Sequence, residues 1–165
     1  MYRTPHAARG AGLTAKALHN WTIRYDLDLF EAKPAGGWRS FSENDVLILS
    51  VAAQLVRYGC PVKQAVDGVR TALGFVNFRT FEGLPDYLYA VELDGEWIIT
   101  ANEGLIGIRY ANGAPPALIR VYVKRCMADA IARLREGARS DVEEEMGGMI
   151  DEIVRTYDDG SSDAA

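Results

Sequence analysis

Residues 12–21 read Gly12-Leu13-Thr14-Ala15-Lys16-Ala17-Leu18-His19-Asn20-Trp21, a glycine turn followed by a helix. Gly12 is the type of residue that ends a helix, and the hydroxyl of Thr14 can cap the next one. Helical spacing places Leu18 and Trp21 on the buried side of this second helix, which is expected to run to about Trp21. Its exposed side then presents three polar residues, Lys16, His19 and Asn20. The stretch therefore predicts two helices joined by a tight turn, the second with a polar face open to a partner.

The flanking sequence supplies three more helices. Thr4-Pro5 predicts the start of a short first helix, with Thr4 as its N-cap, which Gly10 and Gly12 interrupt. Ser42-Glu43-Asn44-Asp45 predicts a capped third helix over residues 46–58, which is apolar on nearly all sides and is therefore expected to be buried. Pro61 begins a fourth helix, which Gly74 ends. The apolar stripe of the fourth helix consists of Val62, Ala65, Val66, Val69 and Leu73.

A loop and a hairpin separate the second helix from the third. Lys33-Pro34-Ala35-Gly36-Gly37 is a sequence typical of loops. Trp38-Arg39-Ser40-Phe41 then alternates bulky and polar side chains, as the return strand of a small hairpin does. The order helix, helix, hairpin, helix, helix is that of a winged helix-turn-helix.

Three segments of this region resemble the MerR family of bacterial transcription regulators. Residues 12–21 resemble the turn and recognition helix of that family. Residues 37–46, beginning Gly37-Trp38-Arg39, resemble its wing, and residues 59–66, beginning Gly59-Cys60-Pro61, resemble the start of the last helix of its DNA-binding domain. The resemblance covers residues 1–74 and implies a domain that reads DNA through the recognition helix and the wing.

The pattern changes after residue 85. Residues 87–93 and 96–101 predict two strands joined by an Asp94-Gly95 turn, and residues 105–110 are expected to continue an antiparallel meander. Residues 119–123 predict a fourth strand that leads into a helix to about residue 136, while a helix from Pro116 onwards is the competing interpretation. A last helix is expected over 140–157. Its apolar face predicts either pairing with a second copy of the chain or packing within its own chain.

The fold class predicted from these patterns is α+β. A winged helix-turn-helix of about four helices occupies residues 1–74, and an antiparallel β-meander with helices occupies residues 75–157. Residues 158–165 form a tail that is expected to be disordered by composition.

Charge is distributed unevenly along the 165 residues. The net charge is −5, but residues 1–74 carry +3 and residues 75–165 carry −8. A basic first half is typical of proteins that bind nucleic acid. No apolar run reaches the length of a membrane span, and two cysteines are too few for a disulfide framework. These features predict a soluble cytoplasmic protein, and the resemblance to the MerR family implies a bacterial or phage source.

The candidate DNA-binding residues follow from this arrangement. Lys16, His19 and Asn20 are expected to enter the major groove, and Trp38 and Arg39 to contact DNA from the wing. Arg24, Lys33 and Lys63 are expected to neutralise phosphates.

Motifs for metal binding, redox chemistry, catalysis or small-molecule binding are weaker in this sequence than those for DNA binding. The cysteines Cys60 and Cys126 have no His or Cys at ligand spacing, so no metal or other cofactor is expected. Cys126 is either a redox-sensitive thiol or, as favoured here, a small buried residue. No nucleophile with a base, and no phosphate-binding loop, indicates an enzyme. Four aromatic residues of the expected meander either line a ligand pocket or pack on the sheet: Tyr87, Tyr89, Trp97 and Tyr110.

The sequence thus predicts a sequence-specific transcriptional regulator that binds double-stranded DNA as a homodimer. Residues 75–157 are expected to serve dimerisation or to receive a small-molecule or protein effector. Two alternatives stay open. One is an architectural DNA-binding protein, of the excisionase or phage-packaging type, and the other is a protein-interaction module similar to an antitoxin.

Overall fold

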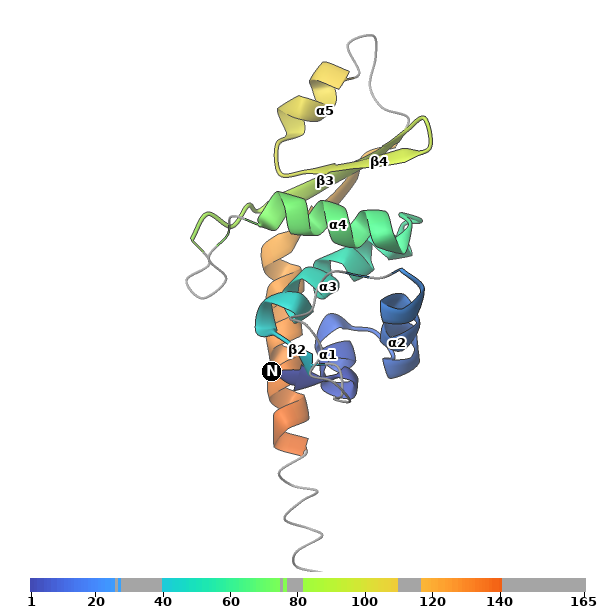
Figure 1. Ribbon diagram of the computed structural model, residues 1–165. Helices are drawn as coiled ribbons and strands as arrows, with labels where there is room; N and C mark the ends of the chain where they lie inside the picture. Colours follow the sequence, from blue (N-terminus) through green and yellow to red (C-terminus); the bar gives the residue numbers. More distant parts are fainter. Residues whose placement is uncertain (26, 28–39, 75, 77–81, 110–116, 141–165) are drawn as a thin grey trace, which may run out of the picture.

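The protein folds around α3, a helix buried on nearly every side, as the computed structural model shows. The structure describes residues 1–25, 27, 40–74, 76, 82–109 and 117–140. The helices are α1 (Thr4–Ala11), α2 (Ala15–Arg24), α3 (Glu43–Arg57), α4 (Val62–Leu73), α5 (Glu103–Arg109) and one over residues 123–140, here named helix 123–140. The strands are β1 (Tyr2–Arg3), β2 (Ser40–Phe41), β3 (Tyr87–Leu93), β4 (Glu96–Thr100) and β5 (Ile119–Tyr122). Helices and small antiparallel sheets confirm the predicted α+β class (Figure 1).

The start of α3 is held by a capping box. The hydroxyl of Ser42 accepts a hydrogen bond from the backbone N–H of Asp45 at 3.1 Å. The Asp45 carboxylate accepts one from the backbone N–H of Ser42 at 2.7 Å. Two backbone donors that the helix leaves open are thereby satisfied. The capped start and the burial of α3, both predicted from the sequence, are confirmed, with Val46, Leu49 and Leu55 fully buried.

The first two helices differ from the expectation in their limits. α1 begins at Thr4, and the residue before it makes no side-chain cap, so Thr4 is not the N-cap. Gly10 does not interrupt α1 but lies inside it, because its missing side chain lets Val46 and Leu134 approach the backbone. α2 continues beyond Trp21 to Arg24. The α4 stripe is buried as expected, except that Val62 is half-buried.

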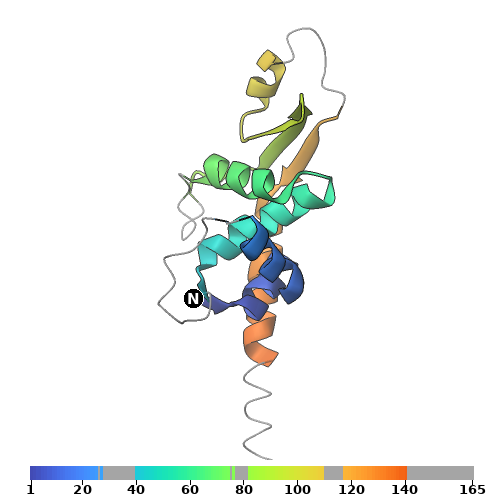
Figure 2. The same ribbon diagram turned by 45° about the vertical axis from the view of Figure 1, so that its right-hand side comes forward.

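A three-stranded sheet with the order β4-β3-β5 packs on α4. Asp94 and Gly95 join β3 to β4 with φ values of 53° and 83°, which fits the tight hairpin turn predicted from this dipeptide. The backbone of Gly68 in α4 lies against Ile99, where a Cβ would come within 2.5 Å of the Ile99 Cδ1. Figures 1 and 2 show that α4 lies between this sheet and the first two helices.

The meander predicted from residue 105 onwards is wrong. Residues 103–109 form α5, because Asn102 caps a helix start: its Oδ1 accepts a hydrogen bond from the Gly104 N–H at 2.9 Å. The chain then returns as β5 on the other edge of β3, with Leu88 opposite Val121. β3 is therefore the central strand and pairs with both others.

The predicted change from strand to helix near residue 123 is confirmed. Residues 119–122 are strand β5 and residues 123–140 are helical, so the competing helix from Pro116 is not formed over residues 119–122. Helix 123–140 runs beside α3 and α1 (Figure 2). Its buried residues are Val123, Met127, Ala130 and Leu134.

One hydrophobic cluster includes core residues from both sides of residue 74. The division into residues 1–74 and 75–157 stays a prediction. The expected hairpin up to residue 39, the helix 140–157 beyond residue 140 and the tail 158–165 lie outside the described residues.

The close contact at Gly10 leads to a stability prediction. In Gly10→Ala the new Cβ would lie 2.6 Å from Val46 Cγ1 and 2.7 Å from Leu134 Cδ2. We expect this overpacking to cost about 1–3 kcal/mol of unfolding free energy, more than the roughly 0.5–1 kcal/mol that alanine gains over glycine in a helix. Urea denaturation measures the difference.

Leu134→Ala serves as the matched second change. The loss in the double variant should be smaller than the sum of the two single losses, because removing the leucine side chain makes room for the new methyl group. A Gly10→Ala protein as stable as the wild type would show that α1 does not pack this closely on helix 123–140.

Candidate nucleic-acid interface

The turn between α1 and α2 is closed by backbone hydrogen bonds. Gly12 adopts a left-handed φ of 70°, and its N–H donates to the Arg9 carbonyl at 3.0 Å. The N–H of Leu13 donates to the Ala8 carbonyl at 2.8 Å. This pair of bonds is a Schellman motif, which requires a residue that tolerates positive φ. α1 therefore ends sharply at Gly12.

α2 begins directly after this turn. The Oγ1 of Thr14 accepts a hydrogen bond from the Ala17 N–H at 3.1 Å, so the cap predicted from the sequence is formed. Two helices joined by three residues, Gly12, Leu13 and Thr14, make a helix-turn-helix.

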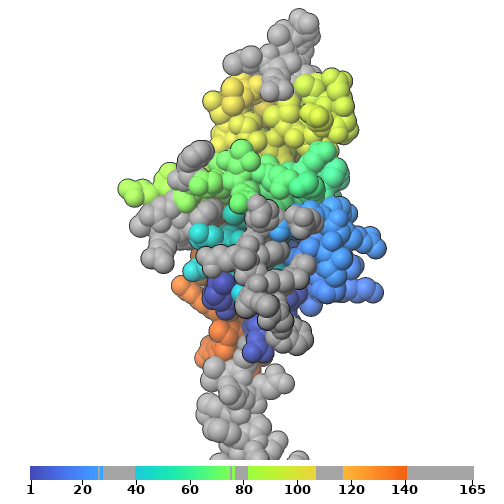
Figure 3. Space-filling model, viewed as in Figure 1, coloured from blue at the N-terminus to red at the C-terminus, as the bar shows by residue number. Residues whose placement is uncertain are grey.

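Packing determines which side of α2 meets solvent. Leu18 and Trp21 are buried, and Thr22 is buried with its hydroxyl donating to the His19 carbonyl at 2.8 Å. The opposite face is open along the whole helix. Its exposed residues are Ala15, Lys16, His19, Asn20, Ile23 and Arg24. Figure 3 shows α2, in blue, protruding from the right-hand side of the molecule.

Ile23 is a residue of this face that the sequence reasoning missed. Its side chain is 59% exposed, an unusual position for an isoleucine. The signal was present in the sequence, since Ile23 follows His19 by four residues and Asn20 by three and so shares their face. The predicted exposure of Lys16, His19 and Asn20 is confirmed by the structure, whereas their contact with DNA stays a prediction.

The two helices carry no negative side chain. Residues 1–25 contain Arg3, Arg9, Lys16 and Arg24 but no Asp or Glu. The backbone carbonyl of Gly12, in the turn, lies 3.5 Å from the Nη2 of Arg57, an exposed residue at the end of α3. A surface with cations and no interspersed carboxylates attracts a polyanion.

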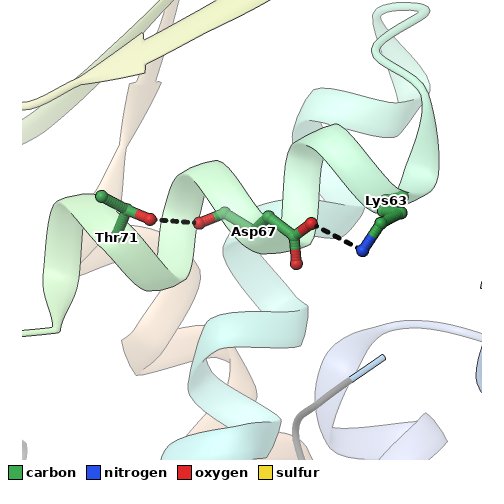
Figure 4. Close-up of polar contacts among 3 residues, drawn as sticks. All are labelled: Lys63, Asp67 and Thr71. Atoms are coloured by element: carbon green, nitrogen blue, oxygen red, sulfur yellow. Dashed lines mark hydrogen bonds and ion pairs between the residues drawn. The ribbon is translucent and has the colours of Figure 1, made fainter. Parts of the chain in front are cut away.

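Lys63 forms an exposed ion pair within α4. Its Nζ lies 3.0 Å from Asp67 Oδ2, one turn further along α4, and the Thr71 hydroxyl donates to the Asp67 carbonyl at 2.8 Å (Figure 4). Both charged side chains are about half exposed, 59% and 48%. An exposed pair of this kind contributes only about 0–1 kcal/mol, so an incoming phosphate can compete for the lysine.

The remaining candidates lie outside the described residues: Lys33, Trp38 and Arg39. Ser40, which follows Arg39, lies in β2 opposite Arg3 of β1.

The aromatic residues of the sheet do not line one pocket. Tyr87 and Tyr89 lie on the face that also carries Tyr122, with the Tyr87 and Tyr122 ring centroids 5.2 Å apart. Trp97 faces the other way, since it pairs with Glu92 rather than with either tyrosine. Its backbone N–H donates to the Oε1 of Gln64 in α4 at 3.0 Å. Trp97 packs against the hydrophobic core and also lines a hollow of about 480 Å³ with Tyr58 and Ile119, so both interpretations stay predictions for this residue. Tyr110 lies outside the described residues.

Neither cysteine is poised to react. Cys60 is buried, and burial raises the pKa of its thiol to about 11. Cys126 is half-buried, and its thiol pKa is also raised, first by burial and then by the nearby Asp129 carboxylate. A raised pKa leaves the thiol protonated and weakly nucleophilic near neutral pH. Within the described ranges, no three His, Cys, Asp or Glu side chains are grouped so as to hold a metal ion.

No family model matches the chain, and no curated protein sequence matches it either. In the part of the chain that the structure describes, no helix has the length and apolar character to cross a membrane.

The buried Cys60 thiol predicts how the stability of the protein changes with pH. Above pH 9 the Cys60 thiol ionises in the unfolded chain, whose pKa is near the ordinary 9.0, whereas the folded protein keeps the proton up to about pH 11. The folded state binds more protons in this window, so its stability should fall as the pH rises from 9 to 11. Urea denaturation at several pH values, compared with Cys60→Ala, isolates this effect because other groups titrate alike in both proteins.

Thiol labelling at pH 8 provides an independent check. An aromatic disulfide reagent should label the folded Cys126→Ala variant only as fast as the protein opens, since Cys60 is its single thiol. Rapid labelling of the folded variant would contradict the burial of Cys60.

Proposed function

We propose that the protein is a sequence-specific DNA-binding transcriptional regulator of the MerR-like winged helix type, with α2 as its recognition helix. The observation that carries this proposal is the exposed face of α2, which carries Lys16, His19 and Asn20 beside Ile23, contains no carboxylate and belongs to a capped helix-turn-helix. A helix of this kind fits the major groove of B-DNA, where its exposed side chains meet base edges.

Four exposed residues of α2 have a chemistry suited to the groove. Asn20 can pair with adenine through two hydrogen bonds, and Lys16 can donate to guanine, each such contact contributing about 1–3 kcal/mol of discrimination. Ile23 offers an apolar surface for a thymine methyl group. His19 can donate or accept a hydrogen bond. Base readout is therefore assigned to the middle of α2.

Backbone contacts are assigned to cations around this helix. Arg24 lies in the last turn of α2, and Lys63 lies in the first turn of α4, where the helix dipole also favours an anion. Arg39 and Trp38 are proposed to contact DNA from the wing. Such contacts fix the position of the protein without reading the sequence.

One helix-turn-helix reads only a few base pairs, so binding as a homodimer to two half-sites is part of the proposal. Residues 75–157 are proposed to support dimerisation or to receive an effector. The apolar pattern of residues 140–157 is the feature that supports pairing.

Selection from genomic DNA fragments, followed by sequencing, tests this function. We expect a recurrent inverted repeat whose affinity falls steeply with salt. Scattered or arrayed sites without a half-site motif would favour an architectural role. The absence of salt-sensitive binding would overturn the proposal and favour a protein-interaction module.

Two variants separate base readout from phosphate contact. Asn20→Ala should relax the preference at one position of the motif, whereas Arg24→Gln should weaken binding to all sequences and reduce the salt slope by about one. Fluorescence anisotropy at several salt concentrations measures both.

Arg120→Gln is the matched control. It removes the same charge as Arg24→Gln, but from β5, which lies across α4 from α2 (Figure 1). Equal losses of affinity in the two arginine variants would contradict a specific role for α2.

A further inference from the structure

A second cationic site is built from residues that do not belong to α2. A hollow of about 260 Å³ opens between α1 and helix 123–140. It is lined by Met1, Tyr2, Arg3, His6, Arg9, Arg133, Leu134, Gly137 and Ala138. The site therefore combines residues from the two ends of the described chain.

Two arginines, Arg133 and Arg9, each contact the backbone of the neighbouring helix, one from helix 123–140 and one from α1. Arg133 reaches from helix 123–140 to α1, where its Nε donates to the Gly10 carbonyl at 3.1 Å. Arg9 reaches the other way and lies over Gly137, where a Cβ would come within 2.7 Å of its Nη1. Gly137 is thus the residue whose missing side chain makes room for the Arg9 guanidinium.

No carboxylate among the described residues lines this hollow. Arg3, Arg9 and Arg133 bring three permanent positive charges to it. The carbonyl of Gly10 accepts a hydrogen bond from Arg133 but carries no net charge to balance them. Like charges held together in this way repel one another, and an anion bound between them removes the repulsion.

The chemistry of the hollow favours a phosphate group. The guanidinium group is planar and presents several N–H donors in a fixed fork that matches phosphate oxygens. Two of the three arginines, Arg3 and Arg9, are exposed and keep their donors available to an incoming ligand.

We propose that this hollow is a phosphate-binding site and that a phosphate of the DNA backbone occupies it in the complex. The inference rests on the proposed function, in which α1 is the first helix of the helix-turn-helix, the helix that crosses the DNA backbone. Arg133 then makes helix 123–140 a part of the DNA-binding surface, which extends beyond residues 1–74.

The charge pattern supports this extension. Helix 123–140 carries five Lys or Arg and two Asp or Glu. The net charge of −8 in residues 75–165 comes entirely from residues 141–165, which hold nine acidic residues and one arginine. The part of the second half that packs on α1 is therefore basic.

The first experiment tests the site without DNA. Pyrophosphate is added to the ¹⁵N-labelled full chain, and the arginine Nε–H signals are followed by NMR, with sodium chloride at equal ionic strength as the reference. We expect the signals of Arg9 and Arg133 to shift, while that of Arg135, an exposed arginine of the same helix outside the hollow, stays in place. Equal shifts at all three arginines, or none, would overturn the site.

The second experiment measures DNA affinity against salt. Arg9→Gln should reduce the salt slope by about one and weaken binding without changing the preferred sequence. Arg135→Gln, which removes the same charge outside the hollow, should leave the slope unchanged. Arg133→Lys keeps the positive charge but lacks the planar set of guanidinium N–H donors, so it should retain most of the dependence of affinity on salt. Thermal melting of each variant shows whether it is folded.

The outcomes separate this inference from the proposed function. If Arg9→Gln binds DNA like the wild type while Asn20→Ala changes the preference, the backbone contact is overturned and the recognition role of α2 stands. If pyrophosphate binds in the hollow but the wild type has no affinity for DNA, the regulator function fails, and the site takes a free phosphate compound instead of a DNA phosphate.

Discussion

The burial of α3 is the constraint on which the rest of the structure depends. A helix that is apolar on nearly all sides must be covered on all sides, and no single neighbour can do so. α1, α4 and β2 cover it from its own half of the chain, and β5 and helix 123–140 close the remaining side. The buried Ser50 shows how closely this last side fits, since its hydroxyl donates to the Leu47 carbonyl at 2.7 Å and lies 3.4 Å from the Cys126 carbonyl.

This arrangement gives the helix-turn-helix a rigid base. α2 contributes Leu18 and Trp21 to the core and keeps its polar side outside, so the proposed reading face is displayed by packing rather than by a flexible arm. The same packing places helix 123–140 against α1, where Arg133 donates to the Gly10 carbonyl and Arg9 lies over Gly137. A binding site placed on packed helices holds its side chains more precisely than one placed on a loop.

Several local features could be predicted because their causes lie within a few residues. The capping box of α3, the Thr14 cap of α2 and the Asp94-Gly95 turn each depend on contacts between near neighbours. The meander was mispredicted because Leu105 to Tyr110 has apolar residues that suit a strand, while the cap at Asn102 favours a helix. The charge of helix 123–140 was hidden because the strongly acidic residues 141–165 were counted together with it.

The sequence by itself determined the two capped helices around Gly12 and the exposure of Lys16, His19 and Asn20, since helix caps, glycine turns and apolar spacing act locally. It left a strand and a helix as alternatives for residues 119–122, which the structure shows to be strand β5. Only the tertiary structure decided that Gly10 lies within α1, that β3 is the central strand and that arginines from α1 and helix 123–140 share one hollow. The hydrogen bond from Arg133 to Gly10 joins residues 123 positions apart. A contact of that separation leaves no periodic signal in the sequence, because it is set by how the buried faces of distant helices pack together.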